Sequence, residues 1–112
     1  MSLILGVLDP HADRAFDQVS RSMLSRAVPG NGWRSALRLE GPLALGVSRP
    51  EWALKAGLAG PVLVVEDGDA WVAADATLYY RDDLRRRMLE RGVRPTGQTP
   101  SHLIAAAYRA WG

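Results

Sequence analysis

Cysteine is absent from the 112 residues of this chain, which excludes disulfide bonds, thiolate metal sites and a cysteine nucleophile. Long apolar runs are absent as well, and none approaches the ~20 residues that a membrane-spanning helix needs. The run Leu3–Leu8 is interrupted by Gly6 and follows no basic segment, so it does not have the pattern of a signal peptide. We therefore expect one soluble, cytoplasmic domain that has no membrane partner.

Lysine and histidine are scarce, and this limits the kinds of ligand that the chain is expected to bind. Lys55 is the one lysine, and the arginines that make up the other basic residues concentrate between residues 81 and 94, where acidic residues interleave them. With a net charge of +2 and no aromatic residues spaced to stack on bases, this segment predicts a solvated helix face and no nucleic-acid partner. His11 and His102 are far apart in the sequence and have no glutamate partner at metal-ligand spacing, so we expect no metal site. No cofactor is expected for this chain either.

The first half of the chain predicts one helix among antiparallel strands. Leu3–Leu8 is apolar on both faces, which is typical of a buried strand, and Asp9-Pro10 predicts a helix start with Asp9 as the N-cap. The apolar stripe expected on this helix consists of Ala12, Ala15, Phe16, Val19, Met23 and Ala27. Turn residues at 29–32 end the helix, and strands at Trp33–Leu37 and Leu43–Val47 follow, joined by a turn at Gly41-Pro42.

The second half predicts a hairpin followed by two helices. Residues 48–60 indicate a loop with one helical turn, and strands at Pro61–Glu66 and Ala70–Ala74 are joined by the turn Asp67-Gly68-Asp69. A charged helix at Arg81–Arg91 is expected to end at a left-handed Gly92. Thr99 and Pro100 suit the N-cap and first position of the last helix. These elements predict an α+β fold in which antiparallel sheets are flanked by helices.

Several segments match, in order, the motifs of one known family. The family opens Met-Cys-x-Ile-x-Gly, where this chain has Met1-Ser2-Leu3-Ile4-Leu5-Gly6. An apolar strand that ends in arginine corresponds to Leu43–Arg49, and Asn-Gly-Glu-Ile-Tyr-Asn before a charged helix corresponds to Asp75–Tyr80. The closing helix, ending Ala106–Gly112, also fits. The chain thus resembles the N-terminal glutamine amidotransferase domain of asparagine synthetases, β-lactam synthetases and lasso-peptide cyclases.

The resemblance implies a set of site residues, most of which differ from the family pattern. Ser2 takes the place of the nucleophilic cysteine, and it would lie on a central strand of the sheet. Asp75 and Ala76 take the places of the Asn and Gly that bind the oxyanion, and a carboxylate repels such a charge. Thr77 and Pro100 stand where the family has carboxylates that hold the substrate ammonium. Arg49 alone keeps the family residue, which binds the substrate carboxylate.

From this resemblance we expect residues 1–112 to form a single glutamine amidotransferase-like domain, truncated at its C-terminal side. Its fold would be a partial α-β-β-α sandwich of the N-terminal-nucleophile type. The expected function is a degenerate glutaminase-like domain without activity of its own, which helps an ATP-dependent amide-forming enzyme, such as a lasso-peptide cyclase, to fold or dock. Its partner would be the synthetase domain or the missing C-terminal part. Self-association is also expected, through the predicted hairpin Val62–Val65 and Ala70–Ala74 or the strand Trp33–Leu37.

Two alternatives remain open at the level of the sequence. In the first, Ser2 is a working N-terminal nucleophile that hydrolyses an amide after removal of Met1, with its own amine as base. In the second, the chain is a small peptide- or protein-binding module, and its four tryptophans could line a groove.

Overall fold

The computed structural model describes residues 2–11, 13, 15–57 and 60–112, which form two groups of elements. The first group holds β1 (Leu3–Leu8), α1 (Ala15–Ala27), β2 (Trp33–Glu40), β3 (Leu43–Pro50) and the short α2 (Glu51–Lys55). The second group holds β4 (Val65–Asp67), β5 (Ala70–Val72), α3 (Arg81–Glu90) and α4 (Pro100–Trp111). The fold is therefore α+β, as the sequence predicts.

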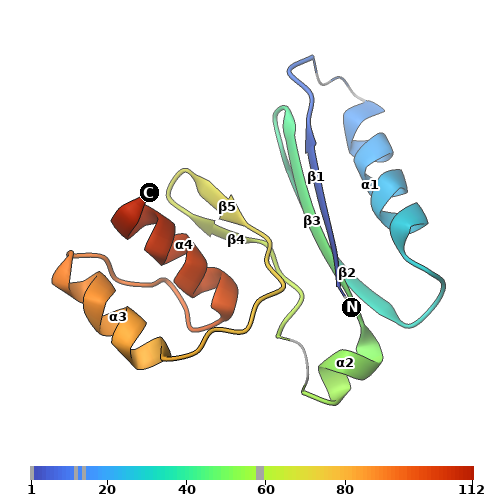
Figure 1. Cartoon of the computed structure of the whole chain (residues 1–112). Coiled ribbons are helices and arrows are strands. Elements are labelled where there is room, and N and C mark those ends of the chain that lie inside the picture. Colours follow the sequence, from blue (N-terminus) through green and yellow to red (C-terminus); the bar gives the residue numbers. More distant parts are fainter. Residues whose placement is uncertain (1, 12, 14, 58–59) are drawn as a thin grey trace.

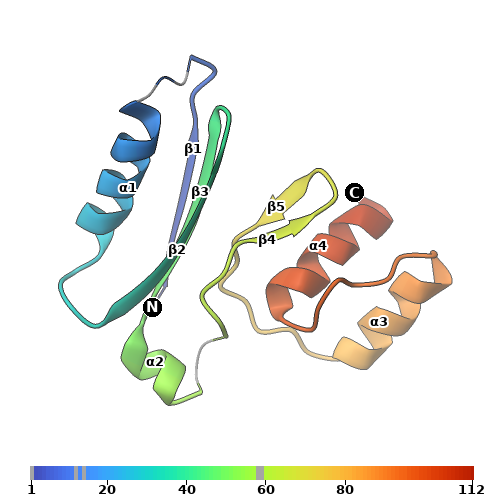
Figure 2. The same cartoon turned by 180° about the vertical axis from the view of Figure 1, so that it is seen from behind.

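The elements lie in layers across the molecule. Figure 1 shows α1 on one face of the sheet of β1, β3 and β2, and the β4–β5 hairpin on the other side of that sheet. Helix α4 packs against both strands of the hairpin, and α3 packs against α4. The reverse view in Figure 2 gives the same order of layers. No helix in the described part of the chain has the length and apolar character to cross a bilayer.

Strand β3 is the centre of the first sheet. It pairs antiparallel with β1 on one side and with β2 on the other, in the order β1-β3-β2. The predicted strands at 33–37 and 43–47 are confirmed, and both extend further than the alternation of the sequence indicates. Because β3 is covered from both sides, its residues Ala44, Val47 and Ser48 are almost completely buried.

The prediction that β1 is buried on both faces is wrong. Its residues alternate between half-buried and exposed, and Ile4 and Leu8 are 50% and 70% exposed. The physical reason is that α1 covers only one face of the sheet at β1, while the hairpin lies over the β2 and β3 side of the other face. Strand β1 therefore lies at an edge of the sheet, with one apolar face open.

Helix α1 also differs from the prediction. It begins at Ala15, whose backbone N–H is bound by the Asp13 carboxylate, whereas the Asp9 carboxylate accepts from the N–H of His11 in a turn before the helix. The residues that face the sheet are Phe16, Ser20 and Leu24. Of the predicted stripe, Val19 and Met23 are exposed and Ala12 lies outside the described residues. A small serine at position 20 fits the close approach to the sheet, so the buried face is rotated from the apolar stripe.

The hairpin is shorter than predicted, and the helices that follow it agree with the sequence. The turn at Gly68 and Asp69 is confirmed, but only three residues on each side pair. The apolar residues 62–64, which were predicted to belong to the first strand, precede it. Helix α3 ends in a Schellman-type turn, with Gly92 at φ 74° and the Val93 N–H bonded to the Met88 carbonyl. Thr99 caps α4 and accepts from the backbone N–H of His102.

The two C-terminal helices enclose the hydrophobic cluster of this half of the molecule. Met88 of α3 and Leu103 and Ala106 of α4 are fully buried against one another. Partly buried side chains surround them, from Leu78, Leu84, Val93, Ala107 and Ala110. The charged residues of α3 lie on its other faces, where Arg85 pairs with Asp82 and Arg86 with Asp83. The predicted solvated helix face is thus confirmed.

Two neighbouring residues of α3 test this arrangement. Replacing Met88 by alanine should lower the free energy of unfolding by about 2–5 kcal/mol, because the buried side chain leaves a cavity between α3 and α4. The control, Leu89→Ala, removes a side chain that is 50% exposed and should cost less than about 1 kcal/mol. Urea denaturation followed by circular dichroism measures both. Equal losses for the two variants would contradict the placement of α3.

Candidate functional site

A cavity of about 440 Å³ lies where the loop after β5 meets the starts of α3 and α4. Its walls come from three segments that are far apart in sequence, at residues 57 and 60–61, at 75–81 and at 98–100. The lining residues are Gly57, Gly60, Pro61, Asp75, Ala76, Thr77, Arg81, Gln98, Thr99 and Pro100. Four positions that the resemblance assigns to glutamine binding and catalysis, at 75, 76, 77 and 100, therefore line one cavity.

Local structure explains why these segments converge. The chain leaves β5 without regular secondary structure through residues 73–78 and turns into α3 at Tyr80, which adopts a left-handed conformation with φ 54°. Such a conformation is uncommon outside glycine, and here it turns the chain sharply so that α3 starts beside the loop. On the other wall, Thr99 and Pro100 begin α4 in the extended-to-helix transition that proline favours. Two helix starts thus open toward the same space.

The polar groups of the cavity are mixed in charge. Asp75 has a half-exposed carboxylate, and Arg81 donates through Nε to the Leu78 carbonyl at 3.2 Å. The hydroxyl of Thr99 lies 2.6 Å from the His102 ring nitrogen Nδ1 as well as capping α4. These groups can hydrogen-bond a small polar ligand, but a carboxylate at position 75 disfavours a negative charge beside it.

Arg49 lies behind the wall of the cavity instead of lining it. It stands at the end of β3 and is 5% exposed. Its guanidinium donates to the backbone carbonyls of Gly60 and Ala74, both at 2.5 Å, and lies 3.8 Å from the Asp75 carboxylate. A Cβ atom on Gly60 would approach the guanidinium to 3.3 Å, so glycine at this position permits the contact. Arg49 thus joins the segments before and after the hairpin.

The structure does not place Ser2 where the resemblance expects it. Ser2 precedes β1, which is an edge strand of the described sheet, so the expectation of a central strand is wrong. Leu3 pairs with Ser48, and continuing this register by one residue would set Ser2 opposite Arg49. The described lining of the cavity does not include Ser2. The backbone therefore brings Ser2 near the end of the strand that carries Arg49, but not into the cavity wall.

Six lining residues were not among the sequence candidates, and three of them, Arg81, Gln98 and Thr99, carry polar side chains; the other three are Gly57, Gly60 and Pro61. Thr99 is recognisable as a helix cap, and a cap next to a loop offers a polar side chain at a helix start. Gln98 and Arg81 carry no such signal, because only the folding of α3 against α4 brings their segments together. No group of three or more histidine, aspartate or glutamate side chains in the described residues could hold a metal ion.

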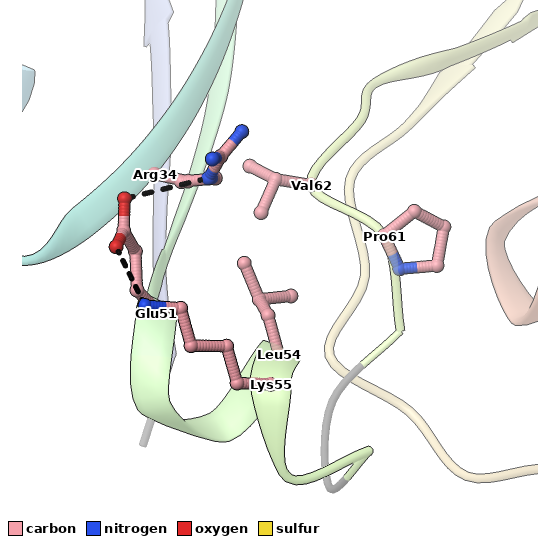
Figure 3. Close-up of a pocket in the computed structure, with 6 residues that line it drawn as sticks. All are labelled: Arg34, Glu51, Leu54, Lys55, Pro61 and Val62. Atoms are coloured by element: carbon pink, nitrogen blue, oxygen red, sulfur yellow. Dashed lines mark ion pairs between the residues drawn. The ribbon is translucent and has the colours of Figure 1, made fainter.

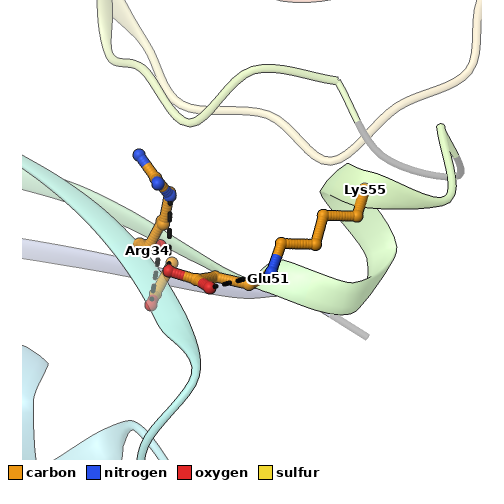
Figure 4. A network of polar contacts seen from close by, with 4 residues as sticks. Arg34, Glu51 and Lys55 are labelled. Atoms are coloured by element: carbon orange, nitrogen blue, oxygen red, sulfur yellow. Dashed lines mark hydrogen bonds and ion pairs between the residues drawn. The ribbon is translucent and has the colours of Figure 1, made fainter.

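A second hollow, of about 430 Å³, lies on the other side of the segment at Pro61. Its lining residues are Arg34 of β2, Glu51, Leu54 and Lys55 of α2, and Pro61 and Val62. Figure 3 shows Arg34 and Leu54 pointing toward Val62, while Lys55 points back to Glu51. Glu51 pairs with Arg34 at 3.4 Å and with Lys55 at 3.7 Å, as Figure 4 shows. Both cations are largely exposed, so these pairs contribute little to stability, and the hollow lacks a buried polar group aimed into it.

Comparison with models of protein families, with curated proteins and with solved structures gives no match for this chain. The chemistry of the cavity residues and their neighbours therefore carries the functional reasoning.

The structural role of Arg49 can be tested against its direct cross-strand partner, Arg34. Arg49→Met leaves two partly buried carbonyls without their donor and should lower the free energy of unfolding by about 2–4 kcal/mol. Arg34→Met, at a side chain that is 69% exposed, should cost less than about 1 kcal/mol. The loss of stability in Arg49→Lys should lie between the losses in the other two variants, because an ammonium lacks the planar fork of donors that reaches both carbonyls. Urea denaturation measures the stability of all three variants. An unchanged stability of Arg49→Met would show that the hydrogen bonds from Arg49 to the two carbonyls are not needed for folding.

Proposed function

We propose that this chain is a catalytically degenerate glutamine amidotransferase-like domain of an asparagine-synthetase-like, ATP-dependent amide-forming enzyme. In this proposal the domain releases no ammonia from glutamine and serves a structural or docking role for the synthetase domain. Lasso-peptide cyclases and β-lactam synthetases are the relatives in which such a loss is expected.

The observation that carries the proposal is the meeting of Asp75, Ala76, Thr77 and Pro100 in one cavity. They come from two segments more than twenty residues apart, and the resemblance selects them without knowledge of the fold. A chance likeness of sequence gives no reason for such positions to share a cavity. Their convergence supports a common origin with the glutamine pocket.

The chemistry of the same positions argues against catalysis. In acyl transfer an oxyanion develops on the substrate and must be met by hydrogen-bond donors, and losing one such donor costs roughly 100-fold or more in rate. Asp75 presents a carboxylate, 3.8 Å from the Arg49 guanidinium, where a donor is needed. The guanidinium is itself engaged by two backbone carbonyls, so it is not free to bind a substrate carboxylate.

The order of layers supports a more specific fold within the α+β class, an α-β-β-α sandwich. One helix, a three-stranded sheet, a two-stranded hairpin and a pair of helices follow one another, which is the order of an α-β-β-α sandwich. We therefore include an N-terminal-nucleophile-type sandwich in the proposal, with β1–β3 in one sheet and β4–β5 in the other.

Glutaminase assays test the loss of chemistry. The chain, with Met1 removed, should release no ammonia from L-glutamine above the level of the Ser2→Ala variant, because neither nucleophile nor oxyanion donors are in place. A coupled glutamate dehydrogenase assay measures the ammonia. Release that disappears in Ser2→Ala would establish the amidohydrolase alternative and contradict the proposal.

A restored pocket tests the family assignment separately. A variant that combines Ser2→Cys, Asp75→Asn, Ala76→Gly, Thr77→Glu and Pro100→Asp carries the family residues at each cavity position. It should bind L-glutamine in calorimetry, through the substrate's ammonium and amide groups since Arg49 stays engaged by the main chain, when the starting chain shows no heat. The control is the same set with Asp75 retained, in which the oxyanion site stays occupied by a carboxylate. Absence of glutamine binding in a folded full variant would count against the relationship.

A further inference from the structure

The outer edge of β1 is an open strand edge without the usual protection. Within the described residues β1 has a paired neighbour only on the β3 side. Exposed edges are usually blunted by charge, proline or a bulge, because their free backbone groups attract other strands. Leu3–Leu8 contains none of these, whereas β2, at the opposite edge, carries Arg34, Arg38 and Glu40. The two edges of one sheet therefore differ in their readiness to accept a strand.

The backbone groups that β1 offers can be identified. The Asp9 N–H donates to the Pro42 carbonyl, so residues 9, 7, 5 and 3 are the ones whose hydrogen bonds run toward β3. The N–H and C=O groups of Ile4, Gly6 and Leu8 consequently point outward. An added antiparallel strand would bond to these three residues.

Apolar side chains flank this edge on both faces of the sheet. Ile4 and Leu8 are exposed on the face that α1 does not cover. On the other face, Arg21 and Ser25 of α1 lie beside Ser35 and Leu37 of β2. A helix turns by about 100° per residue, so Val19 and Met23 lie on the opposite side of α1, above β1. Both are exposed, at 50% and 42%.

We propose that the β1 edge, with Val19 and Met23 above it, is the surface through which two copies of this chain associate. The two β1 strands pair antiparallel around a two-fold axis at Gly6, so that Gly6 faces the partner's Gly6. In this register Ile4 faces the partner's Leu8, and each facing pair exchanges two hydrogen bonds. The three-stranded sheets then join into one continuous sheet.

The position of α1 favours a second copy over an unrelated strand. Neighbouring strands lie about 4.8 Å apart, so the two-fold axis would run ~2.4 Å outside β1. Helix α1 packs equally on β1 and β3. Its axis therefore runs about midway between these two strands, ~2.4 Å from β1 on the side of β3. The two α1 axes would then lie about 10 Å apart, close to the 8–10 Å at which helices pack. The exposed Val19 and Met23 of each copy therefore meet across the axis, with Arg26 beside them on the same flank of α1, and β1 has no charged residue that would oppose its copy.

Sedimentation equilibrium and paired charge variants test the interface. The chain should pass from 12.2 kDa toward twice that mass as its concentration rises through the micromolar range. Ile4→Lys with Leu8→Lys sets like charges opposite each other and should weaken association at least tenfold. Ile4→Lys with Leu8→Glu sets opposite charges there and should associate more tightly than the double lysine variant. Trp52→Lys, at another exposed apolar residue, is the control and should leave association unchanged.

Hydrogen exchange supplies a readout of the register itself. The amides of Ile4, Gly6 and Leu8 should gain protection with concentration, while those of Leu5 and Val7 should be protected throughout. Since the substituted side chains are exposed, circular dichroism should show that both variants fold. A chain that stays monomeric at high concentration would overturn the proposal. A dimer whose strength is the same in both charge variants would also overturn it.

Discussion

The buried guanidinium of Arg49 is the interaction on which the relative placement of the two halves depends. It originates at the end of β3 and binds backbone carbonyls on either side of the β4–β5 hairpin. A guanidinium is costly to bury unless its donors are used, and two short hydrogen bonds and a nearby carboxylate offset that cost here. Arg38 makes a second link, through an ion pair with Glu66 and a stacking contact 4.6 Å from the Trp71 ring centre. Arginine therefore joins the sheet to the hairpin where apolar contacts are few.

The same residue connects stability to the proposed loss of function. A guanidinium engaged by the main chain holds residues 60 and 74 in place; Gly60 lines the cavity, and residue 74 directly precedes the lining residue Asp75. The cavity can therefore keep its shape although a carboxylate at position 75 does not suit an oxyanion. In a degenerate pocket, selection on chemistry is relaxed while selection on folding persists, so an arginine with a structural role would be retained when the substrate-binding residues change.

The extent to which the sequence predicts this structure depends on the range of the interactions involved. Helices α3 and α4 are predictable because their ends are set by local chemistry, at Gly92 and at Thr99-Pro100. The turn at Gly68 is local in the same sense. The two hydrogen bonds from Arg49 are not predictable from a pattern, since their acceptors lie 11 and 25 residues away and are backbone groups that any residue carries. Of the candidate site, the positions at 75–77 and 100 were predictable from a motif, while Gln98 and Arg81 depend on tertiary packing.

The two largest differences between sequence and structure lie side by side, at β1 and on the outer side of α1. Apolar patterning predicts a buried β1 and a stripe through Val19 and Met23, and both are exposed in the single chain. Both differences lie along the open edge of β1, with Ile4 and Leu8 on one face of the sheet and Val19 and Met23 on the other. Pairing of β1 with a second copy would occupy its open backbone edge, set Ile4 beside the partner's Leu8 and cover the α1 stripe, while the sheet face that carries Ile4 and Leu8 stays open. The apolar stripe of α1 is then consistent with burial in the proposed dimer, because periodicity records which residues are removed from water and not which chain removes them.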